Sequence, residues 1–317
     1  MLYNDRGFII FYQSLGSHSL NYQINLKFNK VTIVGIGLLG GSLARDLAKY
    51  QLCETIVGVC QSDHTAQQAL DANVVDQVLP IEQAVIGADL IVFATPMQVM
   101  MPLLDQINSV ISNDTIITDV GSVKNSLYQQ IEARFPERLK QFVLAHPIAG
   151  GEQSGVEASK LGLFANKHVI ITKTPEVNSD YVSLVSQLWT TLGASVVTMS
   201  LAEHDAIFAK TSHLPHVIAF SLVNYLNLQK DRDRLFEMAA AGFYDFTRIA
   251  SSNAHMWRDI CVTNRDQLLL ALDGFREHLS EIRDYVAQSD QQGIYDYFDA
   301  AKNVRDDGLD KKKRSKK

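Results

Sequence analysis

The chain has 317 residues, a length that favours about two domains. Hydrophobic residues make up 46% and charged residues 20%, which is typical of a globular protein with sizeable cores. The formal net charge is −6, but the last seven residues carry six basic side chains. The first 310 residues therefore have 23 Lys and Arg against 35 Asp and Glu, a balance of −12. A body this acidic argues against a nucleic-acid groove, and we expect no nucleic-acid partner.

The three cysteines, Cys53, Cys60 and Cys261, lie far apart and form no CxxC pair. A sparse and odd number of cysteines favours a reducing compartment over a disulfide framework. No apolar run approaches the ~20 residues that span a bilayer. The short run at residues 8–12 is not followed by a signal cleavage pattern. We therefore expect a cytoplasmic protein with no membrane partner.

Strands and helices alternate in the first two thirds of the chain. Residues 1–30 show no clear period and are expected to form an N-terminal extension. Strands are expected at residues 31–34, 55–59, 89–94, 115–119, 142–145, 168–172 and 195–198. Helices are expected at residues 38–50, 96–111, 122–134 and 181–192. This alternation predicts an α/β domain over residues 31–200, with a mostly parallel sheet covered on both faces.

After residue 200 the strand signals stop and apolar residues recur at helical spacing. Helices are expected at residues 202–228, 235–241, 264–287 and 291–304. They are more apolar than a domain of ~100 residues needs for its own core. We therefore expect an all-α domain over residues 201–305 that shares a cleft with the first domain and forms a homodimer. The basic residues within 306–317 are expected to form a solvated tail.

A GxGxxG motif at Gly35, Gly37 and Gly40 follows the first expected strand and opens a helix. The first glycine permits a tight turn, the second lets a pyrophosphate approach the backbone, and the third allows close helix–strand packing. In this context the motif predicts a dinucleotide site in a Rossmann-type domain. The expected cofactor-binding residues come from the ends of three strands: Gly35, Ile36, Gly37, Leu38, Leu39, Gly40, Cys60, Gln61, Ser62, Thr95 and Pro96.

The end of the second strand distinguishes NAD from NADP. An Asp or Glu there binds the ribose hydroxyls of NAD and repels a 2′-phosphate. This chain has Cys60, followed by Gln61 and Ser62, and no Arg or Lys is nearby. Asp63 remains available to bend back toward a ribose. The missing carboxylate favours NADP, with NAD as the alternative.

His146 follows an expected strand and precedes Pro147 and two glycines. Ligands of open α/β sheets bind outside the carboxyl ends of the strands. An imidazole that titrates near neutrality is suited to take a proton from a hydroxyl during hydride removal. The alternative is a structural histidine that caps a turn. Ser122 lies in a second loop after a strand, as the N-cap of the next helix, as a hydroxyl that faces the cleft, or as both at once.

Four further residues in the helical half, His204, His213, His216 and Arg248, are candidate site residues. His213 and His216 are three residues apart, but Pro215 should kink or break their helix, and no Cys or His set completes a zinc site. We expect no metal. Arg248 lies among apolar neighbours, either in a structural ion pair or as a fork for a substrate carboxylate. Next to His204, Glu203 and Asp205 favour the start of a helix.

Five motifs, in this order, resemble the prephenate dehydrogenase family, which includes the cyclohexadienyl and arogenate dehydrogenases. They are GIGLLGGS at residues 35–42, DVGSVK at 119–124, HPIAGGE at 146–152, SHLPH at 212–216 and GFYDFTR at 242–248. The resemblance covers residues 31–304 and implies oxidative decarboxylation of prephenate to 4-hydroxyphenylpyruvate, or of arogenate to tyrosine, in tyrosine biosynthesis. The resemblance implies that NAD or NADP accepts the hydride. It also implies a Rossmann-type domain followed by a helical dimerisation domain.

The resemblance also implies roles for individual side chains. His146 would accept the proton of the 4-hydroxyl, and Ser122 would hydrogen-bond that hydroxyl and orient the histidine. His216 and Arg248 would bind substrate oxygens. Glu152, His204 and His213 would surround the same pocket. Two alternatives remain: another two-domain reductase of the 3-hydroxyacid dehydrogenase type, and a nucleotide-binding dimer without catalytic activity.

Overall fold

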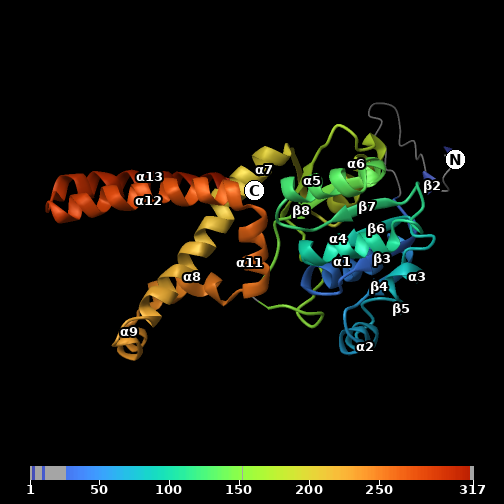
Figure 1. The fold of residues 1–317 in the computed structure, drawn as a ribbon, viewed down its shortest axis with the longest axis horizontal. Helices are drawn as coiled ribbons and strands as arrows, with labels where there is room; N and C mark the ends of the chain where they lie inside the picture. The colour runs from blue at the N-terminus through green and yellow to red at the C-terminus, as the bar shows by residue number, and fades with distance from the viewer. Residues whose placement is uncertain (1, 4–8, 11–25, 152, 315–317) are drawn as a thin grey trace. The chain divides into compact units, whose positions relative to one another are not determined.

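The computed structural model describes residues 2–3, 9–10, 26–151 and 153–314. They belong to two compact units, Met1–Arg265 and Asp266–Lys317 (Figure 1). Within the expected N-terminal extension, β1 (Leu2–Tyr3) and β2 (Ile9–Ile10) form a small antiparallel sheet. The first strand of the main sheet already begins at Phe28, three residues earlier than expected, because the side chain of Phe28 is part of the core.

The main sheet of the first unit has eight strands in the order β10-β9-β8-β7-β6-β3-β4-β5. β8 and β9 are antiparallel, and every other neighbouring pair is parallel. The expected mostly parallel α/β sheet is therefore confirmed. The strands are β3 (Phe28–Val34), β4 (Cys53–Val59), β5 (Gln77–Val78), β6 (Leu90–Phe93), β7 (Ile116–Asp119), β8 (Phe142–Pro147), β9 (His168–Thr172) and β10 (Ser195–Met199).

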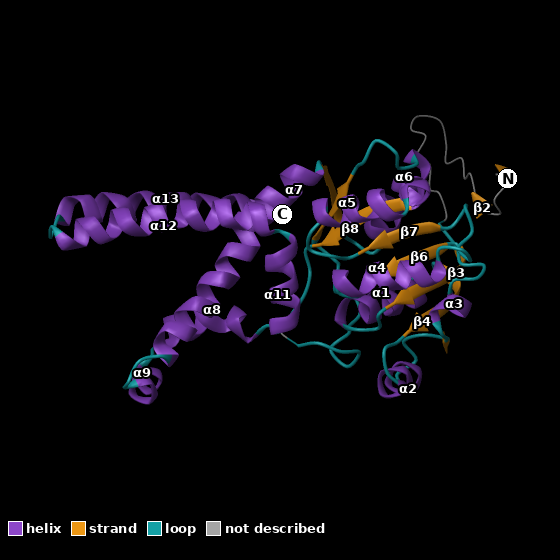
Figure 2. Ribbon diagram, viewed as in Figure 1, coloured by secondary structure: helices purple, strands orange, loops and turns teal. Residues whose placement is uncertain are grey.

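Helices flank the strands of this sheet (Figure 2). They are α1 (Leu38–Lys49), α2 (Asp63–Asp71), α3 (Ile81–Ala84), α4 (Met97–Ile107), α5 (Asn125–Arg134), the 3-10 helix η1 (Pro136–Gln141) and α6 (Ser179–Thr191). β4 and β5 lie on one side of β3, and β6 to β10 lie on the other. The strand order therefore reverses between β3 and β6, next to the glycine loop that follows β3. Such a switch point opens a crevice at the carboxyl ends of the strands in folds of this class.

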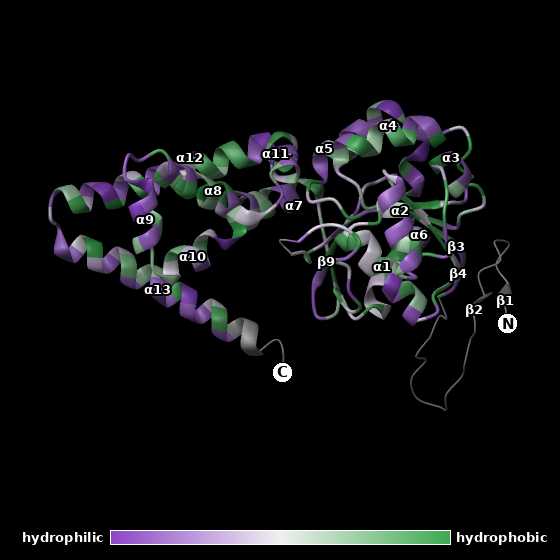
Figure 3. Cartoon of the chain, turned by 90° about the horizontal axis from the view of Figure 1, so that it is seen from below, coloured by the Kyte–Doolittle hydropathy of each residue, from purple (hydrophilic) through white to green (hydrophobic). Residues whose placement is uncertain are grey.

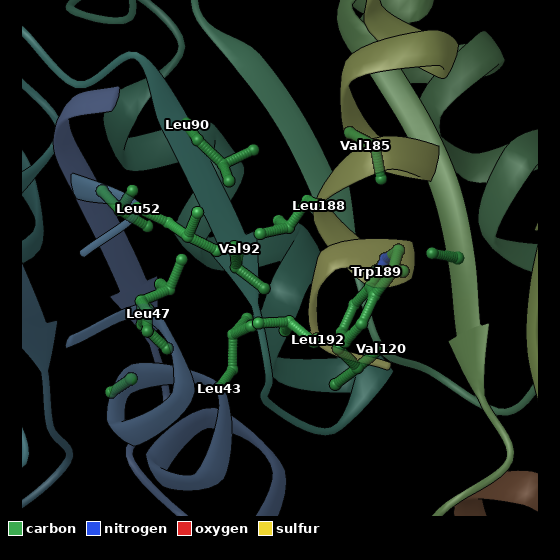
Figure 4. Close-up of a cluster of buried hydrophobic side chains, with 14 of the residues drawn as sticks. Leu43, Leu47, Leu52, Leu90, Val92, Val120, Val185, Leu188, Trp189 and Leu192 are labelled. Carbon is green, nitrogen blue, oxygen red and sulfur yellow. The ribbon is translucent and has the colours of Figure 1, made fainter. Parts of the chain in front are cut away.

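Two hydrophobic clusters fill the two faces of the sheet. Side chains alternate along β6, so that Leu90 and Val92 belong to one cluster and Ile91 and Phe93 to the other. Figure 4 shows the first cluster, where α1 and α6 approach the strands, with Trp189 of α6 among the labelled side chains. α3, α4 and α5 contribute to the second cluster. Burial on both faces explains why the strands are continuous apolar runs.

The rest of the first unit is helical. It contains α7 (Leu201–Phe208), the π-helical segment η2 (Ala209–His213), α8 (Leu214–Asn227), α9 (Arg232–Met238), α10 (Ala241–Thr247), the 3-10 helix η3 (Arg248–Ser251) and α11 (Ala254–Thr263). Pro215 was expected to kink or break its helix, and it does not break it, because α7, η2 and α8 form one helical run. The π-helical segment lies directly before α8, and Pro215 lies in the first turn of α8. Proline has no backbone N–H group, and it is tolerated in the first turn of a helix because an N–H group there has no acceptor within the helix.

By length and mean hydropathy alone, the helical run Leu201–Asn227 is sufficient to cross a membrane. One such helix is weak evidence, since core helices of globular proteins pass the same test. This run also contains a buried aspartate and two buried histidines, Asp205, His204 and His213. Asp205 and His204 are hydrogen-bonded to loop and strand groups of the first unit, and Nδ1 of His213 is hydrogen-bonded to Asn264. We therefore describe the run as a packed helix of this unit.

The second unit consists of most of α12 (Arg265–Ala287) together with α13 (Gln291–Arg314), and Ser289 in the turn between them has a left-handed backbone (φ 54°). Hydrophobic residues recur at intervals along both helices (Figure 3). Several large apolar side chains of this pair are exposed in the single chain, among them Leu270, Leu279, Tyr295, Phe298 and Val304. α13 extends ten residues beyond the expected end at 304, into the part that was expected to be a solvated tail.

Candidate active site

His146 lies within β8, one residue before the strand ends, rather than just after it as expected. The antiparallel partner β9 explains the difference, because the pairing of His146 with Ile170 and of Pro147 with Val169 prolongs the strand. The side chain of His146 is 8% exposed. Its ring has edge contacts with His204 and Phe208, both on α7. A strand end and a helix start therefore meet at this histidine.

A chain of hydrogen bonds begins at His146 and ends at a carboxylate. Nδ1 of His146 lies 2.9 Å from Nε2 of His204, and Nδ1 of His204 lies 2.7 Å from Oδ1 of Asp205. Burial is the main cause that lowers the pKa of His146 well below its usual value, and the cation of Lys124 and any positive charge on His204 or His213 would lower it further. Burial also lowers the pKa of His204, although Asp205 opposes that shift. Both imidazoles are therefore neutral near pH 7.

The carboxylate of Asp205 also binds backbone N–H groups at the start of the helix α5. Asp205 accepts hydrogen bonds from the backbone N–H groups of Lys124 and Asn125, both at 2.9 Å. These bonds and the one from His204 lower the pKa of Asp205 despite its burial. The expected N-cap role of Ser122 is wrong, because the helix begins at Asn125 and the N-cap residue is Lys124. A carboxylate from another helix thus satisfies two of the N–H groups at the start of α5 that have no partner within the helix.

A buried ion pair fixes the strand next to His146. Lys124 is fully buried, and its Nζ donates to Oδ2 of Asp119 and, at 2.7 Å, to the carbonyl oxygen of Ala145. Oδ1 of Asp119 accepts from the backbone N–H of Ala145 at 3.1 Å. Both backbone groups of the residue before the histidine are therefore bonded to one ion pair. This arrangement restricts the position of the imidazole.

His213 presents a polar group that has no partner in the described part of the chain. Asn264 Nδ2 donates to the carbonyl oxygen of Asp205 at 2.9 Å and lies 3.0 Å from Nδ1 of His213. A carbonyl oxygen only accepts, so the amide nitrogen is assigned and Nδ1 of His213 is an acceptor. The proton of neutral His213 is then on Nε2, which is buried without a partner among the described residues. Burial lowers the pKa of His213 to about 4.

Two other expected substrate-binding residues come from neighbouring segments of the same unit. His216, on α8, donates from Nδ1 to the carbonyl oxygen of Ser212 at 2.9 Å and stacks on Trp257 with ring centroids 3.6 Å apart. Arg248 is the first residue of η3, which packs against α8, and its side chain is exposed. The structure thus brings the segments of His216 and Arg248 together.

The glycine loop has the geometry that the motif predicts. Gly35 has φ 99°, and a Cβ there would lie 2.8 Å from the carbonyl oxygen of Ala94. A Cβ on Gly40 would collide with the carbonyl oxygen of Gly35, whereas nothing lies within 4 Å of one on Gly37. Gly37 therefore leaves open space at the start of α1, where helix N–H groups are free to meet an anion.

The other expected cofactor residues lie around this loop. A Cβ on Gly35 would lie 2.9 Å from Cγ2 of Thr95, and Oγ1 of Thr95 is buried without a partner among the described residues. Cys60 lies after β4 and accepts a hydrogen bond from the backbone of Ile36. Ser62 caps α2 through a hydrogen bond from the N–H of Thr65. Gln61 and Pro96 are exposed, and Leu38 and Leu39 begin α1. Ser122, which was expected to act beside His146 and not on the cofactor, is half-buried.

Glu152 lies outside the described residues. Within the described ranges no group of three or more His, Cys, Asp or Glu side chains is placed to hold a metal ion. The sequence patterns indicate no role for Asp119, Lys124 or Asn264. For Asp205 they indicate only a favourable charge at a helix start, and its position directly after His204 is the available signal for a further role.

The ion pair of Lys124 and Asp119 allows a matched test of stability. Lys124→Met should lower the free energy of unfolding by about 3–5 kcal/mol, because it leaves a buried carboxylate without its partner. Arg134→Met is the control: its ion pair with Asp105 is 44% and 46% exposed, and its loss should cost about 1 kcal/mol or less. Urea unfolding of both variants measures the difference, and equal losses would contradict the role of the buried pair.

Comparisons with known proteins agree on one family. The chain matches the family model for the prephenate dehydrogenase nucleotide-binding domain over residues 43–198 and that for the prephenate dehydrogenase dimerization domain over residues 200–300. It is 36% identical over 286 residues to a prephenate dehydrogenase of Bacillus subtilis, with 89% of this chain and 77% of the relative covered. It is 31% identical over 281 residues to a cyclohexadienyl dehydrogenase of Zymomonas mobilis, with 88% and 95% covered.

A solved structure supports the same assignment. The prephenate dehydrogenase of Aquifex aeolicus in complex with hydroxyphenyl propionate and NAD+ has a TM-score of 0.83 and 33% sequence identity. The match covers 89% of this chain and 99% of that chain. The resemblance inferred from the five motifs is thereby confirmed, and the chain belongs to the prephenate dehydrogenase family.

Proposed function

We propose that this chain catalyses the oxidative decarboxylation of prephenate to 4-hydroxyphenylpyruvate, a step of tyrosine biosynthesis, and acts on arogenate as a further substrate. Family membership supports the reaction class. The observation that carries the proposal for this chain is the buried, neutral imidazole of His146 at a strand end, bonded through His204 to Asp205. A neutral imidazole in this position is a base for a hydroxyl proton.

In the proposed reaction His146 takes the proton of the 4-hydroxyl through Nε2, the ring nitrogen that faces away from His204. Ser122 hydrogen-bonds the same hydroxyl. The bound nicotinamide supplies the acceptor for the hydride that leaves the ring carbon. When the ring carboxylate departs as CO2, the electron pair of its bond enters the ring, which becomes aromatic. The oxygen, now phenolic, takes the proton back from His146.

Local cations and donors compensate for the two carboxylates of the substrate. Arg248 provides a bidentate guanidinium, and His216 provides an imidazole that is held flat against Trp257. The N–H at Nε2 of His213 is a buried donor that needs an acceptor, and a substrate oxygen is suited to that role. We propose Glu152 as a further residue around the substrate. His204 acts through His146 instead, since both of its ring nitrogens are bonded within the protein.

The expected cofactor fits the loop after β3. The N–H groups at the start of α1 would hold the pyrophosphate, with Gly37 providing the close approach and Thr95 a hydroxyl that has no partner within the described residues. NAD(P) is thus the hydride acceptor, and we propose a preference for NADP. Burial raises the pKa of the Cys60 thiol, so this side chain is uncharged near pH 7 and does not repel a 2′-phosphate.

We also propose a division near residue 200, with a dinucleotide-binding domain at 31–200 and a helical domain at 201–305. The second domain forms the homodimer, and exposed apolar side chains of α12 and α13 support this role. The proposed location of the enzyme is the cytoplasm.

His146→Asn should abolish prephenate-dependent reduction of NAD(P), with kcat reduced by about 10²–10⁴-fold. The side chain of Asn keeps a polar group but has no base that titrates near neutrality. Absorbance of the reduced nicotinamide measures the rate, with prephenate or arogenate and with NAD or NADP. Binding of NADP and the unfolding transition should stay unchanged.

His278→Asn changes an exposed histidine and is the matched control. Full activity of His146→Asn would exclude the proposed base. No activity of the wild-type chain with either substrate would contradict the proposed function itself.

Cys60→Asp should shift the cofactor preference toward NAD, with the ratio of kcat/KM for NADP to that for NAD falling at least about tenfold, or about 1.4 kcal/mol. The reason is that a carboxylate at this position binds ribose hydroxyls and repels a 2′-phosphate. Cys60→Ser, which adds no charge, serves as the control. An unchanged ratio in Cys60→Asp would show that the residue does not face the ribose.

A further inference from the structure

We infer that His204 and Asp205 are positioning residues that set the tautomer of His146 and leave its Nε2 free of a proton. This inference rests on the proposed role of His146 as the base. The two residues are buried behind that base, and the proton positions apply to the protein before any substrate binds.

Asp205 accepts three hydrogen bonds and has no need of a proton. The backbone N–H groups of Lys124 and Asn125 only donate, and they reach Oδ1 and Oδ2 respectively, each at 2.9 Å. These bonds favour the ionised carboxylate, which agrees with its lowered pKa. An ionised carboxylate only accepts, so Nδ1 of His204, 2.7 Å from Oδ1, must be the donor.

The second link follows from the first. Neutral His204 with its proton on Nδ1 has a lone pair on Nε2, which therefore accepts. Nδ1 of His146, 2.9 Å away, is the donor of that hydrogen bond. The neutral imidazole of His146 then has a lone pair on Nε2, the nitrogen that receives a proton in the proposed reaction. With the opposite tautomer, Nε2 would carry a hydrogen and His146 could not act as a base there.

The surroundings favour this state during the reaction as well. Once His146 is protonated, its Nδ1–H bond to His204 becomes charge-assisted. Charged groups around the pair partly balance one another: Lys124 opposes a cation, whereas Asp119 and Asp205 favour one. The link to a buried carboxylate thus provides orientation together with compensation of charge, as an aspartate does for a catalytic histidine in other enzymes.

A pair of substitutions at His204 separates positioning from packing. In His204→Gln the amide nitrogen can donate to Asp205 and the amide oxygen can accept from His146, so that both bonds keep their polarity. In His204→Leu both bonds are lost while apolar volume is retained. We expect kcat to fall by about 10²–10⁴-fold in His204→Leu and within about tenfold in His204→Gln. KM for prephenate should change little in either variant.

The proton position is measured directly by NMR on protein labelled with ¹⁵N-histidine, with the His146→Asn spectrum used to assign the His146 signals. In the wild-type chain His146 should carry its proton on Nδ1. His204→Gln should retain this tautomer, and His204→Leu should lose it. Ser200→Ala is the matched control: it removes the N-cap of α7, which accepts from the N–H of Glu203, and should leave the tautomer and kcat unchanged.

A wild-type His146 that carries its proton on Nε2 would overturn the inference, as would equal losses of kcat in the Gln and Leu variants. The proposed function fails separately, through absence of prephenate oxidation by the wild-type chain. The NMR result does not depend on that activity, so the two failures are distinguishable.

Discussion

The carboxylate of Asp205 is the interaction on which the candidate site depends. It joins three elements that are distant in sequence, since it begins α5 through Lys124 and Asn125 and orients His204 from α7, which in turn bonds His146 on β8. The same group thus serves helix capping, which stabilises local structure, and the orientation of an imidazole, which serves chemistry. Loss of the carboxylate would disturb both, and this explains why the site is coupled to the packing of α5 and α7.

The ion pair of Lys124 and Asp119 complements this arrangement at a cost in desolvation. Buried ion pairs contribute little net stability compared with apolar residues of similar volume. Here the pair bonds both backbone groups of Ala145 and so fixes the strand that carries His146. Its cationic end also helps to keep the imidazole neutral. The pair is therefore better explained by the position and the pKa of the base than by stability.

Sequence patterns predicted the sheet well, because strands buried on both faces are short apolar runs and the GxGxxG motif identifies the first turn. They placed the start of the first strand at Val31, whereas the strand begins at Phe28, whose burial depends on contacts distant in sequence. The motifs identified His146, but the connection from Asp205 to α5 was not predictable, since a carboxylate that caps another helix has no local signature. Pro215, which was expected to kink or break its helix, does not break it, because a π-helical segment accommodates the proline.

The net charge of the chain conceals the local charges that matter for a dianionic substrate.

The proposed chemistry depends above all on a buried, neutral His146 as the base. The pH dependence of kcat/KM for prephenate tests it most directly, because that ratio reports groups of the free enzyme. A base with a lowered pKa stays unprotonated as the pH falls, so activity is lost only when the pH falls through that lowered value. The account predicts constant kcat/KM from pH 8 to below 6.5, the ordinary pKa of histidine. A half-loss of kcat/KM at or above pH 6.5 would contradict it.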